Sequence, residues 1–236
     1  MPDRDVLVIL PTYNERENLD ELFDGIRRHA PGADVLIVDD GSPDGTAEHA
    51  VAAGIRLGHI DVLQRGARRG IGSAYRDGFK IGLERGYRWL VSMDADLSHE
   101  PRYLEPLLAA RASADYVIGS RYLRGISVVN WSLDRLALSV AGNAYARSIT
   151  AMPLRDCTSG FQCIRREVLE AVGVDRLRFN GYAFLIECKY HAHRHGFRMH
   201  EVPIVFVERR AGTSKNSVRT AFQTLWAVWA MRFGLA

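Results

Sequence analysis

The sequence predicts an α/β fold in which a parallel sheet carries helices on both faces. Short apolar runs alternate with helical patterns through the first half of the 236 residues, and this alternation is typical of parallel sheets. The length is enough for one large domain that buries about 70% of its unfolded surface. A hydrophobic fraction of 47% and a charged fraction of 25% are ordinary for a soluble globular protein.

Five short apolar runs have the length and composition of buried strands. They lie at residues 6–10, 35–38, 60–63, 89–93 and 116–119. Helical patterns follow from residue 17, from residue 46, over 72–85 and from residue 101. The first of these helices is indicated by apolar side chains at three- and four-residue spacing, namely Leu19, Leu22, Phe23 and Ile26.

The pattern changes after residue 121. Residues 131–152, 181–195 and 217–236 predict helices, 156–166 a loop and a strand, and 202–207 another strand. Large apolar side chains share one side of the last helix: Val218, Phe222, Leu225, Trp226, Trp229 and Phe233. Whether that side packs within the protein, on a partner or on a membrane stays open, because packed surface helices are amphipathic too.

Composition and cysteine usage limit the partners and the compartment. The formal net charge is only +3, so no nucleic-acid partner is expected. Cys157, Cys163 and Cys188 lack a CxxC spacing and are expected to be free, buried thiols in a reducing compartment. We find no signal peptide, and no apolar run reaches the roughly 20 residues that cross a bilayer.

Polar side chains follow four of the predicted strands at the point where each strand ends. The first strand is followed by Pro-Thr-Tyr-Asn-Glu at 11–15, the second by two aspartates at 39–40, the fourth by Asp-Ala-Asp at 94–96 and the fifth by Ser-Arg at 120–121. Turn preference alone explains any one of these sets. Four sets at one edge favour a ligand site, because ligands of open α/β sheets bind at the carboxyl ends of the strands.

Asp94 and Asp96 are the strongest chemical candidates. Two carboxylates that flank a small residue can share a hard divalent cation, and Mg²⁺ is typically held by one or two carboxylates plus substrate phosphates. Such a cation would neutralise the charge on a departing diphosphate. The alternative is a pair of N-caps for the helix near Pro101, but both aspartates precede that start by several residues.

Other ligand-binding motifs do not match. A dinucleotide-binding site needs glycines directly after the first strand, where this chain has Pro-Thr-Tyr-Asn-Glu, and no Walker A loop is present. His191, His193 and His195, with His200 nearby, invite a metal interpretation. No HExxH acid stands between them, so a solvated helix end is favoured.

Taken together, these motifs resemble the dolichol-phosphate and polyprenol-phosphate mannose synthases, which are inverting family 2 glycosyltransferases with a GT-A fold. The resemblance runs in order through residues 11–15, 39–46, 94–99, 119–121, 131–132, 135, 142–143, 156–161, 201–203 and 208–215. It implies a single GT-A domain over 1–236 with a mixed, mostly parallel sheet. Within it, 1–121 would bind the nucleotide sugar, and 122–236 would supply the acceptor-binding and interfacial helices.

The resemblance also implies which residues bind the donor, GDP-mannose. They are Pro11, Tyr13, Glu15, Val38, Asp40, Asp94, Ala95, Asp96, Arg121, Arg209 and Lys215. The first five would surround the guanine and ribose, and residues 94–96 would hold the diphosphate, with Mg²⁺ or Mn²⁺ on Asp94 and Asp96. Arg209 and Lys215 would lie on a loop that closes over the donor. Ser98 stands where relatives often carry a metal-binding glutamine, so it is not counted as a ligand.

The implied acceptor is a dolichyl or polyprenyl phosphate. A phosphate monoester has a second pKa of about 6, so its oxygen is already anionic at neutral pH and needs no dedicated base. Arg121 and Arg135 suit that anion because guanidinium groups bind phosphate bidentately. The expected catalytic residues are therefore Asp96, Arg121 and Arg135, while Asp156 would only orient. Arg135 alone could equally be a solvated helix charge.

The implied reaction transfers mannose to the lipid phosphate by one displacement with inversion, which gives a β-linked product. A lipid acceptor implies peripheral binding at the cytoplasmic face of a membrane, through the amphipathic helices or a separate membrane-anchoring subunit. The alternatives are a lipid-phosphate glucosyltransferase that uses UDP-glucose, a non-catalytic nucleotide-sugar-binding scaffold, and a sugar nucleotidyltransferase. A processive polysaccharide synthase is disfavoured because the chain contains no QxxRW element.

Overall fold

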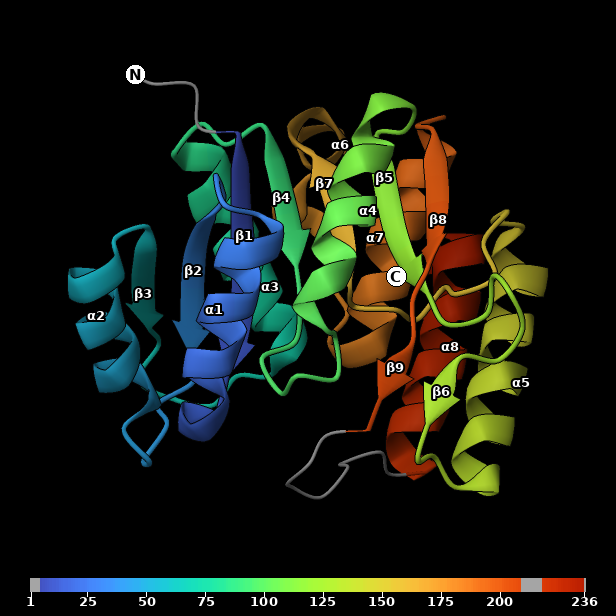
Figure 1. The fold of residues 1–236 in the computed structure, drawn as a ribbon. Helices are drawn as coiled ribbons and strands as arrows, with labels where there is room; N and C mark the ends of the chain where they lie inside the picture. Colours follow the sequence, from blue (N-terminus) through green and yellow to red (C-terminus); the bar gives the residue numbers. More distant parts are fainter. Residues whose placement is uncertain (1–4, 209–217, 236) are drawn as a thin grey trace.

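The computed structural model describes residues 5–208 and 218–235, with the backbone alone for 218–222. Its centre is a seven-stranded sheet in the order β3-β2-β1-β4-β7-β5-β8 (Figure 1). The strands are β1 (Val6–Thr12), β2 (Asp34–Asp39), β3 (Ile60–Gln64), β4 (Trp89–Ser92), β5 (Tyr116–Ser120), β7 (Gln162–Arg165) and β8 (Met199–Pro203). Every pairing is parallel except those of β7 with β4 and β5. The prediction of a mixed, mostly parallel sheet is confirmed.

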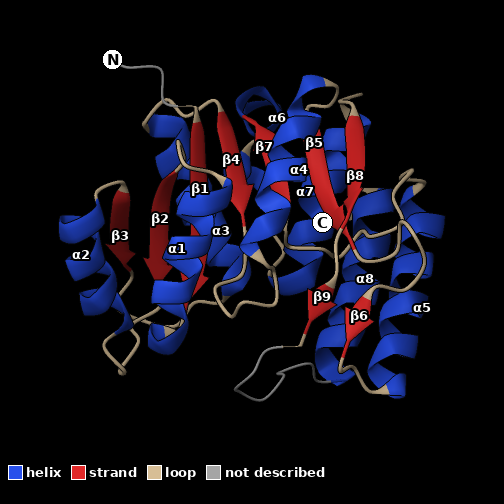
Figure 2. Cartoon of the chain, viewed as in Figure 1, coloured by secondary structure: helices blue, strands red, loops and turns tan. Residues whose placement is uncertain are grey.

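Helices cover both faces of this sheet (Figure 2). They are α1 (Leu19–His29), α2 (Thr46–Leu57), α3 (Ile71–Glu84), α4 (Leu104–Ala109), α5 (Leu133–Thr150), α6 (Arg166–Val172), α7 (Gly181–Arg194) and α8 (Val218–Phe233), with short 3₁₀ turns at Arg16–Asn18, Pro101–Tyr103, Ala110–Ala112 and Val174–Arg176. Alternate side chains of β1 point to opposite faces of the sheet and pack into two different hydrophobic cores. Leu7 and Ile9 pack with α3 and α7, whereas Val8 and Leu10 pack with α1 and α4. Burial on both faces explains why the strand sequences are continuously apolar.

The predicted single strand at 202–207 is wrong. β8 ends at Pro203, and β9 (Phe206–Val207) pairs instead with β6 (Val128–Val129) in a separate two-stranded sheet. Proline has no N–H to continue a ladder, and the chain leaves the main sheet after Ile204, whose N–H still bonds the Ser120 carbonyl at 3.0 Å. α6 and β6 were not predicted.

Helix α8 packs against α5 and α7 at one end of the sheet (Figure 1). Its buried side carries Ala227, Val228, Ala230 and Met231. Trp226, Trp229 and Phe233 are instead 60%, 43% and 57% exposed. These three aromatic side chains thus do not face this protein's core. None of the helices within the described ranges combines the length and apolar character that a bilayer span requires.

The prediction that the three cysteines are free and buried is confirmed. Cys157, Cys163 and Cys188 are free and buried. Burial raises the pKa of Cys157 and Cys163 to about 12 and that of Cys188 to about 11. These thiols are therefore protonated and unreactive near neutral pH.

Candidate functional site

The carboxyl ends of β1, β2, β4 and β5 meet at one edge of the sheet, as predicted from the sequence. Because β7 runs antiparallel between β4 and β5, the segment that precedes it, residues 156–161, reaches the same edge. Residues 204–208 arrive there too, since they follow β8, which is parallel to β5. The topology thus adds two segments from the second half of the chain to the four predicted strand ends.

Asp39, the last residue of β2, and Asp40, which follows it, bind this chain's own groups. Asp39 accepts hydrogen bonds from the Thr12 hydroxyl at 2.9 Å and from the N–H groups of Gly41 and Ser42 at 3.0 and 2.9 Å. Asp40 pairs with Arg65, a side chain with no exposed surface. It also accepts the N–H groups of Arg69 and Gly70, each at 3.2 Å. Asp40 therefore fixes the loop at 65–70 beside the end of β1.

The other residues that were expected to bind the nucleoside lie around this loop. Tyr13 is half-buried, and the Arg68 guanidinium carbon lies 4.3 Å from the centre of its ring. Glu15 accepts a hydrogen bond from the Asn18 amide at 2.7 Å. Val38, which pairs with Pro11 across β1 and β2, is fully buried in the core. Only the main chain of Val38 could face a ligand.

Asp94 and Asp96 lie on the turn after β4. The fully buried Tyr75 of α3 donates its hydroxyl hydrogen bond to Asp94 Oδ1 at 2.8 Å. Burial, followed by the charge of Asp94, raises the pKa of Tyr75 well above its usual value, so the hydroxyl stays protonated and donates. Asp96 Oδ1 accepts from the N–H of Ser98 at 3.1 Å and from the Ser98 hydroxyl. Ser98 thus orients Asp96.

The turn of Asp94 and Asp96 also rests on an aromatic cluster. His99 Nδ1 accepts a hydrogen bond from the Asp94 N–H at 3.1 Å. The His99 ring stacks on Phe161, with centroids 5.2 Å apart, and meets the edge of Phe206 at 5.4 Å. Phe206 follows β8, so this cluster connects the carboxylate turn with the second half of the chain.

The donor set at this turn fits a hard divalent cation. Asp94 and Asp96 present carboxylate oxygens at the ligand-binding edge of the sheet, and hard cations prefer such oxygens. Among the described residues, no group of three or more His, Cys, Asp or Glu side chains is arranged to hold a metal. A cation here would therefore need further oxygens from a substrate, as Mg²⁺ commonly does beside phosphates.

Arg121 and Asp156 form a buried, bidentate ion pair at this edge. Arg121 Nε donates to Asp156 Oδ2 and Nη2 to Oδ1, both at 2.7 Å. Burial alone would raise the pKa of Asp156, but the charge and hydrogen bonds of Arg121 bring it below its usual value. Burial would lower the pKa of Arg121, and the charge of Asp156 raises it instead. Both side chains therefore stay charged.

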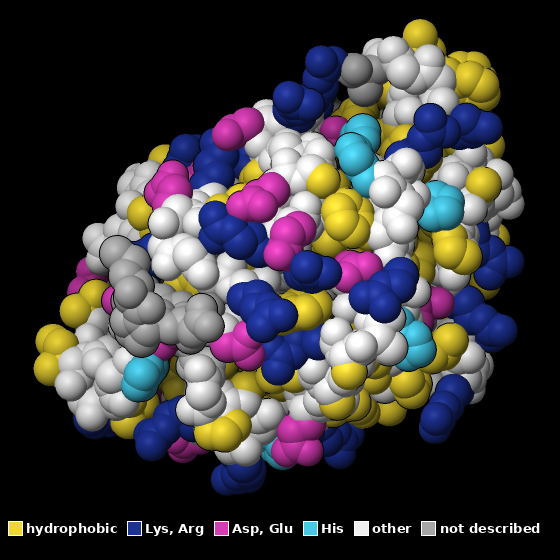
Figure 3. All heavy atoms as spheres, turned by 90° about the horizontal axis from the view of Figure 1, so that it is seen from above, with side chains coloured by type: hydrophobic (Ala, Val, Ile, Leu, Met, Phe, Trp, Pro, Cys, Tyr) yellow, Lys and Arg dark blue, Asp and Glu magenta, His cyan; other side chains and the backbone are white. Residues whose placement is uncertain are grey.

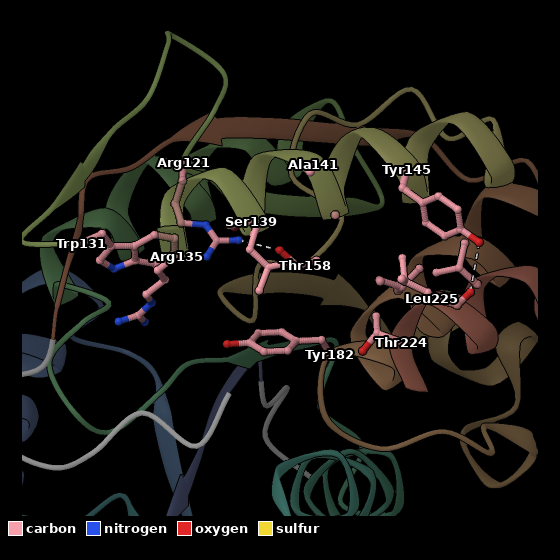
Figure 4. Close-up of a pocket in the computed structure, with 14 residues that line it drawn as sticks. Arg121, Trp131, Arg135, Ser139, Ala141, Tyr145, Thr158, Tyr182, Thr224 and Leu225 are labelled. Atoms are coloured by element: carbon pink, nitrogen blue, oxygen red, sulfur yellow. Dashed lines mark hydrogen bonds between the residues drawn. The ribbon is translucent and has the colours of Figure 1, made fainter. Parts of the chain in front are cut away.

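A cavity of about 390 Å³ opens between α5, α7 and α8, beside Arg121 (Figure 4). The cationic side chains Arg121 and Arg135 are drawn toward one end of it beside Trp131, and Tyr145, whose hydroxyl donates to the Leu225 carbonyl at 3.2 Å, toward the other. The remaining lining residues are Leu138, Ser139, Ala141, Gly142, Thr158, Tyr182, Ile186, Thr224 and Val228. The cavity is therefore suited to a molecule with a polar head and an apolar tail.

Two donors at the polar end are buried without a hydrogen-bond acceptor. They are Trp131 Nε1 and Arg135 Nε. Arg135 Nη1 pairs with Glu208, and the guanidinium carbon lies 4.2 Å from the centre of the Trp131 ring. Arg135 is thus not a solvated helix charge. Unpaired buried donors are uncommon in folded proteins, and two together indicate a place for acceptor oxygens.

The structure brings together most of the residues singled out in the sequence. Asp94, buried Ala95 and Asp96 occupy one turn, with Arg121 and Arg135 at the cavity nearby. Arg209 and Lys215 lie outside the described residues. Sequence reasoning missed Tyr75 and Tyr182, because helical periodicity does not tell which strand end a helical side chain meets.

Comparisons with known proteins agree with this geometry. A family model described as glycosyl transferase family 2 matches residues 7–173. Polyprenol monophosphomannose synthase of Mycolicibacterium smegmatis is 44% identical over 237 residues, which cover 98% of this chain and 89% of that protein. Undecaprenyl-phosphate mannosyltransferase of Micrococcus luteus is 45% identical over 212 residues, which cover 90% and 87%.

A solved structure shares the fold at lower identity. Glucosyl-3-phosphoglycerate synthase of Mycobacterium tuberculosis, in complex with Mn²⁺, UDP-glucose and phosphoglyceric acid, has a TM-score of 0.67 and 20% identity. The match covers 98% of this chain and 80% of that one.

The sheet, its carboxylate-bearing edge and these comparisons define a glycosyltransferase with the GT-A fold. The chain belongs to glycosyl transferase family 2. Its resemblance to the polyprenol-phosphate mannose synthases is confirmed by the two relatives at 44% and 45% identity.

Proposed function

We propose that this enzyme transfers mannose from GDP-mannose to a polyprenyl phosphate, with inversion at the sugar carbon. Two relatives that align with most of the chain are named for mannose transfer to polyprenol or undecaprenyl carriers. The observation that carries the proposal is the cavity with the cations Arg121 and Arg135 at one end and a mostly apolar lining beyond them. A polyprenyl phosphate has an anionic head that suits the arginines and a prenyl tail that suits the apolar lining.

On the donor side, the nucleoside would bind where β1 and β2 end. Tyr13 and Glu15 would contact it with their side chains, and Pro11 and Val38 through the main chain. Asp40 would act through the 65–70 loop, which it holds by hydrogen bonds. Arg209 and Lys215, outside the described residues, belong to the proposal as a closing loop.

Asp94 and Asp96 would hold Mg²⁺ or Mn²⁺ together with the donor diphosphate. When bound, the cation supplies positive charge against the leaving diphosphate. The solved structure of glucosyl-3-phosphoglycerate synthase, which has a similar fold, contains Mn²⁺ together with UDP-glucose. In this chain, Tyr75 and Ser98 would keep the two carboxylates oriented for that ligand.

On the acceptor side, Arg121 and Arg135 would bind the lipid phosphate. The phosphate oxygen is anionic at neutral pH, so it can form the bond to the sugar carbon while the bond to the diphosphate breaks, without proton transfer to a base. Asp156 would hold Arg121 in position. The unpaired N–H groups of Trp131 and Arg135 would then gain acceptors.

The exposed apolar side of α8 would lie on a membrane surface. Trp226, Trp229 and Phe233 project from α8, and Leu133 and Leu138 are exposed on the neighbouring α5. Aromatic and aliphatic side chains of this kind bind bilayer interfaces. We place the enzyme at the cytoplasmic face as a peripheral protein. A membrane-anchoring subunit that covers the same side is the alternative.

The decisive experiment measures transfer of radiolabelled sugar to polyprenyl phosphate in detergent with Mg²⁺. We expect transfer from GDP-mannose, none from UDP-glucose, and loss of transfer with EDTA. Transfer from UDP-glucose alone would overturn the donor but keep the acceptor. No transfer from either donor, by protein that is folded by circular dichroism, would contradict the proposed reaction.

A further inference from the structure

Lys189 of α7 is a fully buried cation close to the candidate site. Its ammonium donates to the Ser159 carbonyl at 2.8 Å and to the Leu185 carbonyl at 3.3 Å. Within the part of the chain that the structure describes, no carboxylate forms a direct ion pair with it at 4.0 Å or less. Burial lowers the pKa of Lys189 to about 8, against the opposing charge of Asp156.

Packing alone does not explain a lysine at this position. Removing an ammonium from water is costly unless other groups compensate, and an apolar side chain of similar length would fill the space without that cost. The Leu185 carbonyl belongs to the preceding turn of the same helix, so that bond is local. The bond to Ser159 is the one that joins Lys189 to another element.

Ser159 lies in the segment 155–160, which is held at both ends by side chains from the sheet. Glu201 of β8 accepts the N–H groups of Arg155 and Asp156, each at 2.8 Å. The Ser92 hydroxyl of β4 donates to the Gly160 carbonyl at 2.7 Å. Between these two ends, Asn143 of α5 bonds Cys157 and Thr158, and Lys189 of α7 bonds the Ser159 carbonyl.

This segment touches both halves of the candidate site. At one end, Asp156 carries the bidentate bonds to Arg121. At the other end, a Cβ on Gly160 would lie 3.6 Å from Asp94 Oδ1, so the backbone of Gly160 borders the carboxylate turn directly. A shift of the Ser159 carbonyl would therefore change the spacing between Arg121 and Asp94.

We propose that Lys189 is a positioning residue for sugar transfer: its ammonium holds the 155–160 segment so that the acceptor-side Arg121 and the donor-side Asp94 keep their spacing. The inference rests on the roles proposed above for Arg121 and Asp94. Lys189 itself touches neither substrate. Its loss should therefore lower kcat more than it raises either KM, because misplaced reacting groups slow the chemical step.

The test compares wild-type enzyme with Lys189→Met, which keeps length and removes charge. We expect kcat at about pH 7 to fall by about 10- to 100-fold while the KM values for both substrates change by less than about threefold. Ile26→Ala, in the core on the other face of the sheet, serves as a control for general destabilisation. It should lower the melting temperature and leave kcat unchanged.

The pH dependence separates positioning from packing. Lys189 faces Asp156, Cys157 and Arg121 from the neighbouring segments and Cys188 from its own helix. Both thiols have pKa values of about 11 or above, so they stay neutral where the lysine titrates. As the wild-type ammonium loses its proton above about pH 8, its bond to the Ser159 carbonyl changes from a charged hydrogen bond to a weaker neutral one, so the ratio of wild-type to Lys189→Met kcat should fall.

A ratio that stays constant from about pH 6.5 to 9.5, or a kcat loss that matches the loss of folded protein, would overturn the positioning role. Variants Arg121→Ala and Asp94→Ala are measured alongside. If they lose activity and Lys189→Met does not, only the positioning role fails. If they retain activity, the proposed site itself is wrong, whatever Lys189→Met does.

Discussion

Arg121 and Asp156 join two segments that are 35 residues apart in the sequence. They form two parallel hydrogen bonds of 2.7 Å, and both side chains are buried. A buried pair of this kind adds little net stability, but removing one partner leaves an uncompensated charge at a cost of about 3–5 kcal/mol. The pair is therefore best understood as a means of fixing the Arg121 guanidinium at the cavity.

Asp96→Ala should abolish turnover and preserve the fold. Asp96 is only half-buried on a turn, so we expect the free energy of unfolding to change by about 1 kcal/mol or less. Loss of a carboxylate that supports the leaving diphosphate should lower kcat by at least about 100-fold. The assay measures sugar transfer beside urea unfolding, with Glu100→Ala from the same turn as the control. Undiminished turnover in Asp96→Ala would refute the metal site.

Arg135→Ala should weaken the lipid acceptor more than the donor, because Arg135 lines the cavity and carries a buried, unpaired Nε. We expect the KM for polyprenyl phosphate to rise by about tenfold or more, as loss of a charged hydrogen bond implies. The KM for GDP-mannose should stay nearly constant. Arg147→Ala, an exposed arginine on the same helix, is the matched control. Equal loss for both substrates would contradict the assignment.

Asp115 should make stability depend on pH at the acid end. Hydrogen bonds from Arg198, then others from the Arg198 backbone and Arg165, lower the pKa of Asp115 to about 2. Because the folded-state pKa lies below the unfolded value of about 3.9, its stabilisation is present above that value and is lost as pH falls toward 2. In urea unfolding, the difference between wild type and Asp115→Asn should shrink from pH 5 to pH 2. A difference independent of pH would exclude this carboxylate as the cause.

Single residues show where sequence reasoning stops. Asp94 and Asp96 could be identified because they follow a strand whose carboxyl end must reach the ligand edge. Tyr75 could not, since its partner is 19 residues away and depends on how closely α3 packs. The long-range bonds of Lys189 and Glu201 to the 155–160 segment have no local pattern either.

At the scale of elements, close packing of α3 determines where Tyr75 lies. A Cβ on Gly78 would approach Ile9 Cγ2 to 2.5 Å, and one on Gly82 would approach Leu90 Cδ2 to 2.3 Å. These two glycines, one helical turn apart, let α3 lie directly on β1 and β4. The glycine spacing was the signal in the sequence that could have indicated this approach.

The exposed side of α8 should mediate membrane binding. Trp226→Ser combined with Trp229→Ser should reduce co-sedimentation with anionic vesicles by about tenfold, because apolar contact area at the bilayer interface is lost. The melting temperature should change little, since neither side chain belongs to the buried core. Ile55→Ser, 85% exposed on α2, is the control. Unchanged co-sedimentation of the double variant would contradict the proposed surface.

Elements with strong periodicity were predictable, and those that depend on tertiary pairing were not. The helix predicted at 131–152 is observed as Leu133–Thr150, and the strand predicted at 35–38 as Asp34–Asp39. The antiparallel direction of β7 and the division of 202–207 into β8 and β9 depend on partners distant in the sequence. Apolar runs indicate burial but not the neighbour or its direction.

At the scale of the whole molecule, the candidate site and the opposite end of the sheet differ. The end seen in Figure 3, where the strands begin, mixes basic and acidic side chains with scattered apolar ones. The other end carries the carboxylate turn and the cavity. The proposed division at residue 121 is not a boundary in the sheet, because β7 and β8 from the second half complete the sheet of the first.

The position of β7 has a consequence for synthesis on the ribosome. β4 and β5 are separated by a strand that is made more than 40 residues after β5 begins. Until β7 emerges, the nascent chain exposes apolar strand edges with no hydrogen-bonding partner, and such edges promote aggregation. Translation that stops before residue 162 should therefore yield an insoluble fragment or one held by chaperones, so completion of the sheet must await the second half of the polypeptide.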